Sequence, residues 1–112
     1  MGSAQWSSVT CRKNNLVYRR SAGRRESTLE RWCVRYARDR GTVVAKLTEC
    51  AGVPDRIFFV PGGRALIIEF KHRGEVPEEL QEWYLTKLLA DGYTVGWCDS
   101  REGFLAIYNK GK

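Results

Sequence analysis

Two short stretches of the sequence contain the residue types that metal-assisted cleavage of a phosphodiester requires. Asp55 follows a proline and opens one apolar run, while Glu69 and Lys71 close a second apolar run. Carboxylate oxygens are the ligands that Mg²⁺ prefers, and a bound Mg²⁺ polarises a phosphate and lowers the pKa of a bound water. A nearby ammonium group can orient that water or stabilise the charge that grows on the phosphate. Hydrolysis of a phosphodiester is therefore the candidate chemistry.

A predicted β-hairpin brings these two stretches together. Residues 56–60 (RIFFV) and 64–71 (RALIIEFK) have the apolar, β-branched and aromatic composition of strands, and the turn 61–63 (PGG) joins them. In a hairpin, the start of the first strand lies beside the end of the second. We therefore expect Asp55 to lie close to Glu69.

The alternation of side chains along a strand sorts the residues at the end of this hairpin. Glu69 and Lys71 should share one face of the sheet, with Phe70 on the other. Two carboxylates and a lysine would then converge, and the backbone carbonyl of Phe70 could add a further metal ligand. The alternative is an ordinary Glu–Lys pair at an exposed strand end, because the E-x-K spacing alone is a weak signal.

The remaining segments predict an α/β fold with one mixed sheet. Ser27 and Glu30 form a capping-box pattern that predicts a helix over residues 28–40. The further expected elements are a strand at 42–47, a helix at 78–91, a strand at 93–98 and a last short strand or turn at 104–108. The order is α-β-β-β-α-β, and a right-handed crossover through the second helix would make strands 64–71 and 93–98 parallel.

Composition and charge favour one cytoplasmic domain with a basic arm. The chain has 112 residues, 43% of them hydrophobic, and no apolar run that resembles a secretion signal or a membrane span. The net charge is +6, and residues 26–112 carry basic and acidic side chains in equal number. The excess therefore lies in residues 1–25, on Arg12, Lys13, Arg19, Arg20, Arg24 and Arg25. Such an arm can neutralise the phosphates of a nucleic acid, although a solvated tail is the alternative.

The four cysteines are scattered and form no C-x-x-C pair. A zinc site or redox motif is therefore not expected. In a reducing cytosol they should be free thiols that fill the core.

Several short motifs, taken in their order along the chain, resemble the VRR-Nuc domain (virus-type replication-repair nuclease) of the PD-(D/E)xK nuclease superfamily. The resemblance covers about residues 26–98, and it is carried by Gly52-Val53-Pro54-Asp55-Arg56, Gly62-Gly63-Arg64, Ile68-Glu69-Phe70-Lys71, and Gln81 ahead of Trp83 and Leu88. It implies a restriction-endonuclease-like core in residues 26–112, with a central mixed sheet flanked by helices.

The resemblance also implies roles for individual residues. The metal-binding aspartate and glutamate fall on Asp55 and Glu69, and the lysine falls on Lys71. A glutamate of the first helix usually completes the metal site. Both Glu26 and Glu30 qualify, since they share one helix face, and Glu30 is favoured. Gln81 matches a glutamine of the second helix that would assist Lys71 or the phosphate; the alternative is a solvent-facing residue.

Standalone members of this family occur in phages and bacteria and are similar in size to this chain. They imply a Mg²⁺- or Mn²⁺-dependent endonuclease that acts on branched DNA, as a homodimer that resolves Holliday junctions. The host cytoplasm is the expected location if the chain is phage-encoded. The alternatives are a flap or nick nuclease of the same fold, or a non-catalytic nucleic-acid-binding module.

Overall fold

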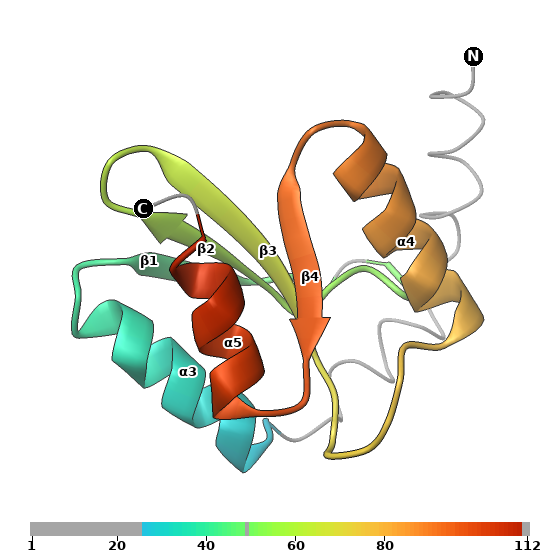
Figure 1. Cartoon of the computed structure of the whole chain (residues 1–112), viewed down its shortest axis with the longest axis horizontal. Helices are drawn as coiled ribbons and strands as arrows, with labels where there is room; N and C mark the ends of the chain where they lie inside the picture. Colours follow the sequence, from blue (N-terminus) through green and yellow to red (C-terminus); the bar gives the residue numbers. More distant parts are fainter. Residues whose placement is uncertain (1–25, 49, 111–112) are drawn as a thin grey trace.

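A mixed four-stranded sheet forms the centre of the computed structural model, which describes residues 26–48 and 50–110 (Figure 1). Its strands lie in the order β1 (Val43–Lys46), β2 (Arg56–Val60), β3 (Arg64–Phe70) and β4 (Thr94–Cys98). β1 and β2 are antiparallel, as are β2 and β3, whereas β3 and β4 are parallel. The predicted α/β class and the predicted parallel crossover are both confirmed.

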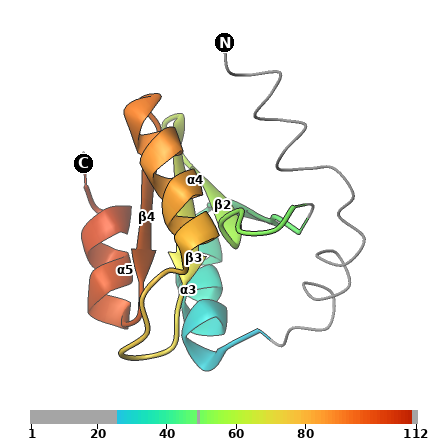
Figure 2. The ribbon, with the colours of Figure 1, turned by 90° about the vertical axis from the view of Figure 1, so that its right-hand side faces the viewer.

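Three helices cover the two faces of this sheet. The helix α4 (Glu79–Ala90) connects β3 to β4 on one face, which Figure 2 shows from the side. The helices α3 (Thr28–Arg38) and α5 (Arg101–Tyr108) pack against each other and against the opposite face. The chain turns to one face of the sheet after β3 and to the other face after β4. In α/β proteins this divergence creates a crevice at the ends of the two strands, where ligands commonly bind.

The hairpin of β2 and β3 forms as predicted. Gly62 and Gly63 turn the chain with φ of +99° and +91°, which residues with a side chain rarely adopt. The register pairs Arg56 with Ile68. One step further along the same register places Asp55 opposite Glu69.

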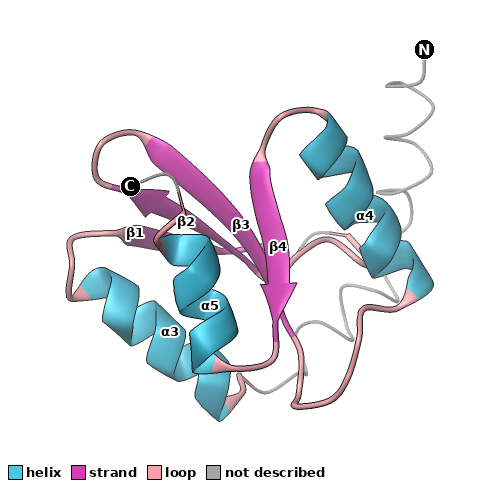
Figure 3. Ribbon diagram, in the orientation of Figure 1, coloured by secondary structure: helices cyan, strands magenta, loops and turns pink. Residues whose placement is uncertain are grey.

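The prediction of a last short strand or turn at 104–108 is wrong, because this segment belongs to the helix α5 (Figure 3). Ser100 caps the helix by accepting a hydrogen bond from the Gly103 N–H at 3.0 Å. Phe104 and Tyr108 lie four residues apart and are both buried against the core. A short apolar run fits either a strand or a helix, and here one helical turn brings both rings onto the same core.

The face of the sheet beneath α3 and α5 carries the aromatic core. Phe58, Phe70 and Phe104 are buried there, with ring centroids 5.5–6.4 Å apart. Cys33 and Cys98 are free thiols packed into the same core.

Burial raises the pKa of both of these thiols, and that of Cys98 reaches about 12. The expectation of free thiols is wrong for Cys50, which takes part in a disulfide bond.

Within residues 26–48 and 50–110, no helix is long and apolar enough to cross a membrane.

Candidate active site

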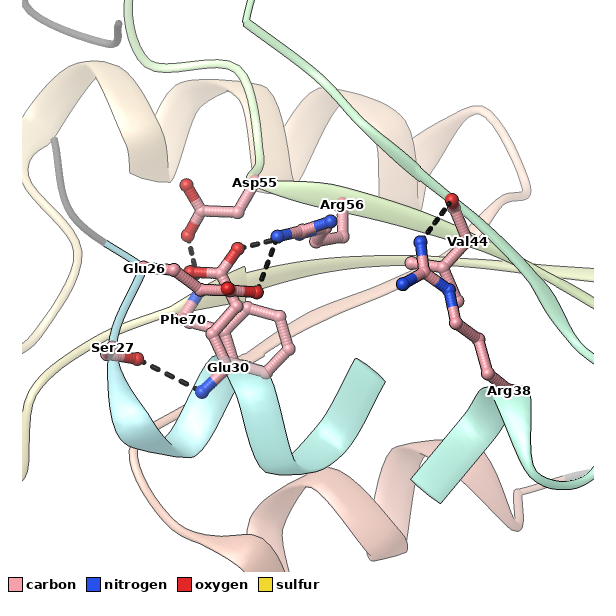
Figure 4. A network of polar contacts seen from close by, with 8 residues as sticks. All are labelled: Glu26, Ser27, Glu30, Arg38, Val44, Asp55, Arg56 and Phe70. Carbon is pink, nitrogen blue, oxygen red and sulfur yellow. Dashed lines mark hydrogen bonds and ion pairs between the residues drawn. The ribbon is translucent and has the colours of Figure 1, made fainter. Parts of the chain in front are cut away.

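Asp55 is fixed from both sides at the start of β2. Its backbone carbonyl accepts a hydrogen bond from the Leu47 N–H at 2.9 Å, which ties it to the end of β1. Its carboxylate oxygen Oδ2 accepts a hydrogen bond from the Phe70 N–H at 2.8 Å (Figure 4). The amide that directly follows β3, that of Lys71, donates instead to the Cys98 carbonyl in β4. The Phe70 N–H points toward β2 at the point where the backbone hydrogen bonds between β2 and β3 end. The Asp55 side chain therefore accepts the hydrogen bond that the backbone of β2 does not.

Glu69, Gln81 and Lys71 form a chain of hydrogen bonds beside Asp55. The Gln81 Nε2 donates to Glu69 Oε2 at 2.7 Å, and the Lys71 Nζ donates to Gln81 Oε1 at 3.0 Å. The direct distance between Lys71 Nζ and Glu69 Oε2 is 4.0 Å, so the amide lies between the two charges. The side chain of Glu69 is only 1% exposed and that of Lys71 is 10% exposed.

The first turn of α4 supplies Gln81 and is itself held in place by the loop before Asp55. Gln81 Oε1 accepts a second hydrogen bond, from the Glu78 N–H at 2.8 Å, so it also caps the start of the helix. Gly52 has a φ of +78°, and a Cβ atom there would lie 2.5 Å from Leu80 Cγ. Only glycine therefore allows this loop to pack directly on α4.

The two candidate glutamates of the first helix contact an arginine. Arg56 Nε donates to Glu30 Oε2 and Arg56 Nη2 donates to Glu26 Oε2, both at 2.7 Å (Figure 4). The N-terminal cap predicted at Ser27 is present, since Ser27 Oγ accepts from the Glu30 N–H at 3.0 Å. The glutamate side chain turns to the sheet, so the reciprocal half of the predicted capping box is replaced by the contact with Arg56.

Sequence reasoning did not single out Arg56, whose side chain is only 9% exposed. Its position in the strand could have indicated that Arg56 is buried, because it shares a face with Phe58 and Val60, which are buried against α3 and α5. A charge at such a position needs a charged partner from the helix above it.

The structure therefore brings Asp55, Phe70, Glu69, Lys71 and Gln81 together at one end of the sheet. Glu30 and Glu26 lie at the same end but contact Arg56. The predicted nucleic-acid-binding residues Arg12, Lys13, Arg19, Arg20, Arg24 and Arg25 lie outside the described residues.

The donor chemistry of Asp55 and Glu69 fits a small hard cation. Mg²⁺ commonly takes one or two carboxylates from a protein and keeps several waters. Two carboxylates meet this need, with the buried Glu69 held rigidly by Gln81. Among residues 26–48 and 50–110, no group of three or more histidine, cysteine, aspartate or glutamate side chains is placed to hold a metal ion. The fit is thus to an ion that takes only two of its ligands from side chains.

Comparison with known proteins agrees with this arrangement. No family profile matches the chain. Over 80 residues it is 32% identical to the protein named "Putative nuclease p44" of Acyrthosiphon pisum secondary endosymbiont phage 1, and this match covers 70% of the chain and 86% of that protein. A solved structure described as a VRR_NUC domain superimposes with a TM-score of 0.69, at 19% identity, over 78% of this chain and 97% of the other. The sequence match shows that the chain belongs to the family of this phage protein, and the superposition shows that it has the fold of the VRR_NUC domain.

Proposed function

We propose that this protein is an endonuclease that hydrolyses the phosphodiester backbone of branched DNA with Mg²⁺ or Mn²⁺. The observation that carries the proposal is the meeting of Asp55, Glu69 and Lys71 at the ends of β2 and β3, with Gln81 linking the last two. The relative named as a phage nuclease supports the class of reaction. An intact set of two carboxylates and a lysine also favours an enzyme over a non-catalytic DNA-binding module.

Each residue of the site has a distinct part in this proposal. Asp55, Glu69 and the backbone carbonyl of Phe70 would hold the cation, which when bound supplies positive charge at the phosphate and a more acidic water. Glu30 stays a predicted further ligand, although its contact with Arg56 favours a structural part.

Lys71 and Gln81 would act on the reacting groups and their positions. Lys71 would orient the attacking water or place its charge beside the phosphate as negative charge develops. Gln81 holds the ammonium of Lys71 at 3.0 Å and the carboxylate of Glu69 at 2.7 Å. It thereby keeps Lys71 from closing onto Glu69.

A four-way DNA junction is the substrate that we propose first. Symmetrical cutting of two strands requires two active sites, which a homodimer with twofold symmetry would provide. The net charge of +6, concentrated in the sequence of residues 1–25, supports binding to a polyanion. A flap or nicked duplex is the alternative substrate for the same active site.

Cleavage of end-labelled four-way junction, flap and plain duplex DNA tests the proposal. Each substrate is incubated with Mg²⁺, Mn²⁺ or EDTA, with wild-type protein and the Glu69→Ala variant. Paired, metal-dependent cuts in the junction that the variant does not make are the expected result. Cutting of flaps alone would support the proposed active site but make flaps, not junctions, the substrate. Binding without any cutting would show a non-catalytic module.

A further inference from the structure

A groove of about 770 Å³ lies between the segment that follows β3 and the start of α3, and it shares Lys71 with the group that Lys71 forms with Asp55, Glu69 and Gln81. Lys71 lines it, and so do His72 and Arg73 in the segment that follows β3. Its other wall is the first turn of α3, which contributes Arg31. Because Lys71 belongs both to the groove and to the hydrogen-bond chain with Gln81, a ligand at the active site extends naturally into this groove.

The exposed charges of the groove are mainly positive. Arg31 and Arg73 are exposed, and neither forms an ion pair with any residue in the described part of the chain. The acidic members of the lining have partners: Glu26 is paired with Arg56 at 2.7 Å, and Asp99 Oδ2 accepts from the Gly74 N–H at 3.0 Å. The lining of the groove thus carries three cations, Lys71, Arg31 and Arg73, and two carboxylates, Glu26 and Asp99.

A second hollow of about 350 Å³ continues the path between the starts of α3 and α5. Arg73 and Asp99 line both hollows, and Arg101 is added at the start of α5. Arg101 lies over the ring of Trp32, with its guanidinium carbon 4.5 Å from the ring centroid. The linings of the two hollows thus contain the cations Lys71, Arg31, Arg73 and Arg101 together with the acidic residues Glu26, Asp99 and Glu102.

We propose that this groove binds the sugar–phosphate backbone of the DNA strand on one side of the phosphate that is cut, chiefly through Arg31 and Arg73. The inference rests on the proposed function, because it takes the active site to hold the phosphate that is cut. Exposed arginines can contact phosphates bidentately and carry no information about sequence, as expected of an enzyme that recognises the shape of DNA. The first turn of α3 lines the same groove, and the N-terminus of a helix favours anions.

Binding measurements on matched double variants test the groove. Arg31→Gln with Arg73→Gln removes two cations from it. Arg35→Gln with Lys110→Gln removes two exposed cations that line neither hollow, and so serves as the control. Fluorescence anisotropy with a labelled four-way junction, in EDTA and at several salt concentrations, gives the affinity and its salt dependence.

The groove variant should bind the junction more weakly than the control variant by roughly one to two orders of magnitude at 0.1 M salt. The slope of log affinity against log salt should fall by about two. Single-turnover cleavage at subsaturating protein should slow in the groove variant in step with its lost affinity, whereas the control variant should cleave at about the wild-type rate. Arg73→Gln alone, in a loop, repeats the test if the double variant folds poorly.

Equal affinity and equal salt slope in the groove and control variants would overturn the inference, while wild-type cleavage would still uphold the proposed function. The opposite failure is also distinguishable. A wild-type protein that binds the junction through Arg31 and Arg73 but never cuts it would support the groove and overturn the nuclease.

Discussion

Two clusters of charged side chains lie at the same end of the sheet, on its opposite faces, and they differ in how their charges meet. Beneath α3, Arg56 contacts Glu26 and Glu30 directly, each at 2.7 Å. Beneath α4, Lys71 and Glu69 remain 4.0 Å apart with the neutral amide of Gln81 between them. One cluster has joined its opposite charges, and the other holds them apart.

This difference separates a structural part from a chemical one. Burying a charge costs free energy that a direct ion pair with good hydrogen bonds can offset. The Arg56 cluster follows this rule and fixes the start of α3 to β2. The Glu69 cluster forgoes the direct contact, and it lies beside Asp55 at the strand ends, where a cation and a phosphate can approach. We expect substitutions in the first cluster to change stability and those in the second to change activity.

The largest effect should come from Glu69→Gln. The amide can still accept the hydrogen bond from Gln81, but it loses the charge that would hold a cation. We expect the single-turnover cleavage rate in Mg²⁺ to fall by roughly a thousandfold or more, which is about 4 kcal/mol of transition-state stabilisation. Urea unfolding should show little change in stability.

Glu30→Gln is the matched control for this prediction, since it changes a buried glutamate of the other cluster in the same way. It should keep most of the cleavage rate. An equal loss in Glu30→Gln with the fold intact would instead place Glu30 in the metal site.

The next largest effect should come from Arg56→Met, measured as the free energy of unfolding in urea. Removing the cation leaves Glu30, whose side chain is 6% exposed, buried without its partner. Breaking a buried pair in this way typically costs about 3–5 kcal/mol. Glu26→Gln should cost much less, because the Glu26 side chain is 30% exposed. An unchanged urea midpoint in Arg56→Met would show that the pair does not hold α3 to the sheet.

The two clusters also differ in how far the sequence alone could predict them. The proximity of Asp55 and Glu69 follows from local patterns: two strand-like runs, a glycine turn, and the register that this turn sets. The ion pairs of Arg56 depend on which helix covers which face of the sheet, and that is a property of tertiary packing. The same limit explains the wrong prediction for residues 104–108, where a short apolar run could not distinguish strand from helix.

Gln81 offers an intermediate effect that tests why the charges of the second cluster stay apart. In Gln81→Ala, Lys71 can close onto Glu69 and form a direct ion pair like that of Arg56. We expect the single-turnover rate to fall by roughly 10–100-fold, as for other residues that orient a ligand of a metal site.

Gln81→Glu distinguishes positioning from simple support of the helix. A glutamate can still accept hydrogen bonds from Lys71 and from the Glu78 N–H, but it cannot donate to Glu69. If this variant kept the wild-type rate and pH profile, the hydrogen bond from Gln81 to Glu69 would have no part in the reaction.

The smallest effect concerns Cys98, which lies at the end of β4 in the core beneath α3 and α5. Burial is the main cause that raises its pKa from 9.0 to about 12, and the charges of Asp99 and Asp55 add to it. A raised pKa means that the fold favours the neutral thiol, so its contribution to stability is complete below pH 9 and is lost as the pH rises toward 12. Over that interval this thiol should lower the free energy of unfolding by roughly 1.4 kcal/mol per pH unit.

Urea unfolding of wild type and Cys98→Ala between pH 8 and pH 10 measures this contribution as a difference in slope, so the cavity that the alanine leaves does not affect the comparison. Identical slopes in wild type and Cys98→Ala would show that the thiol is not held neutral.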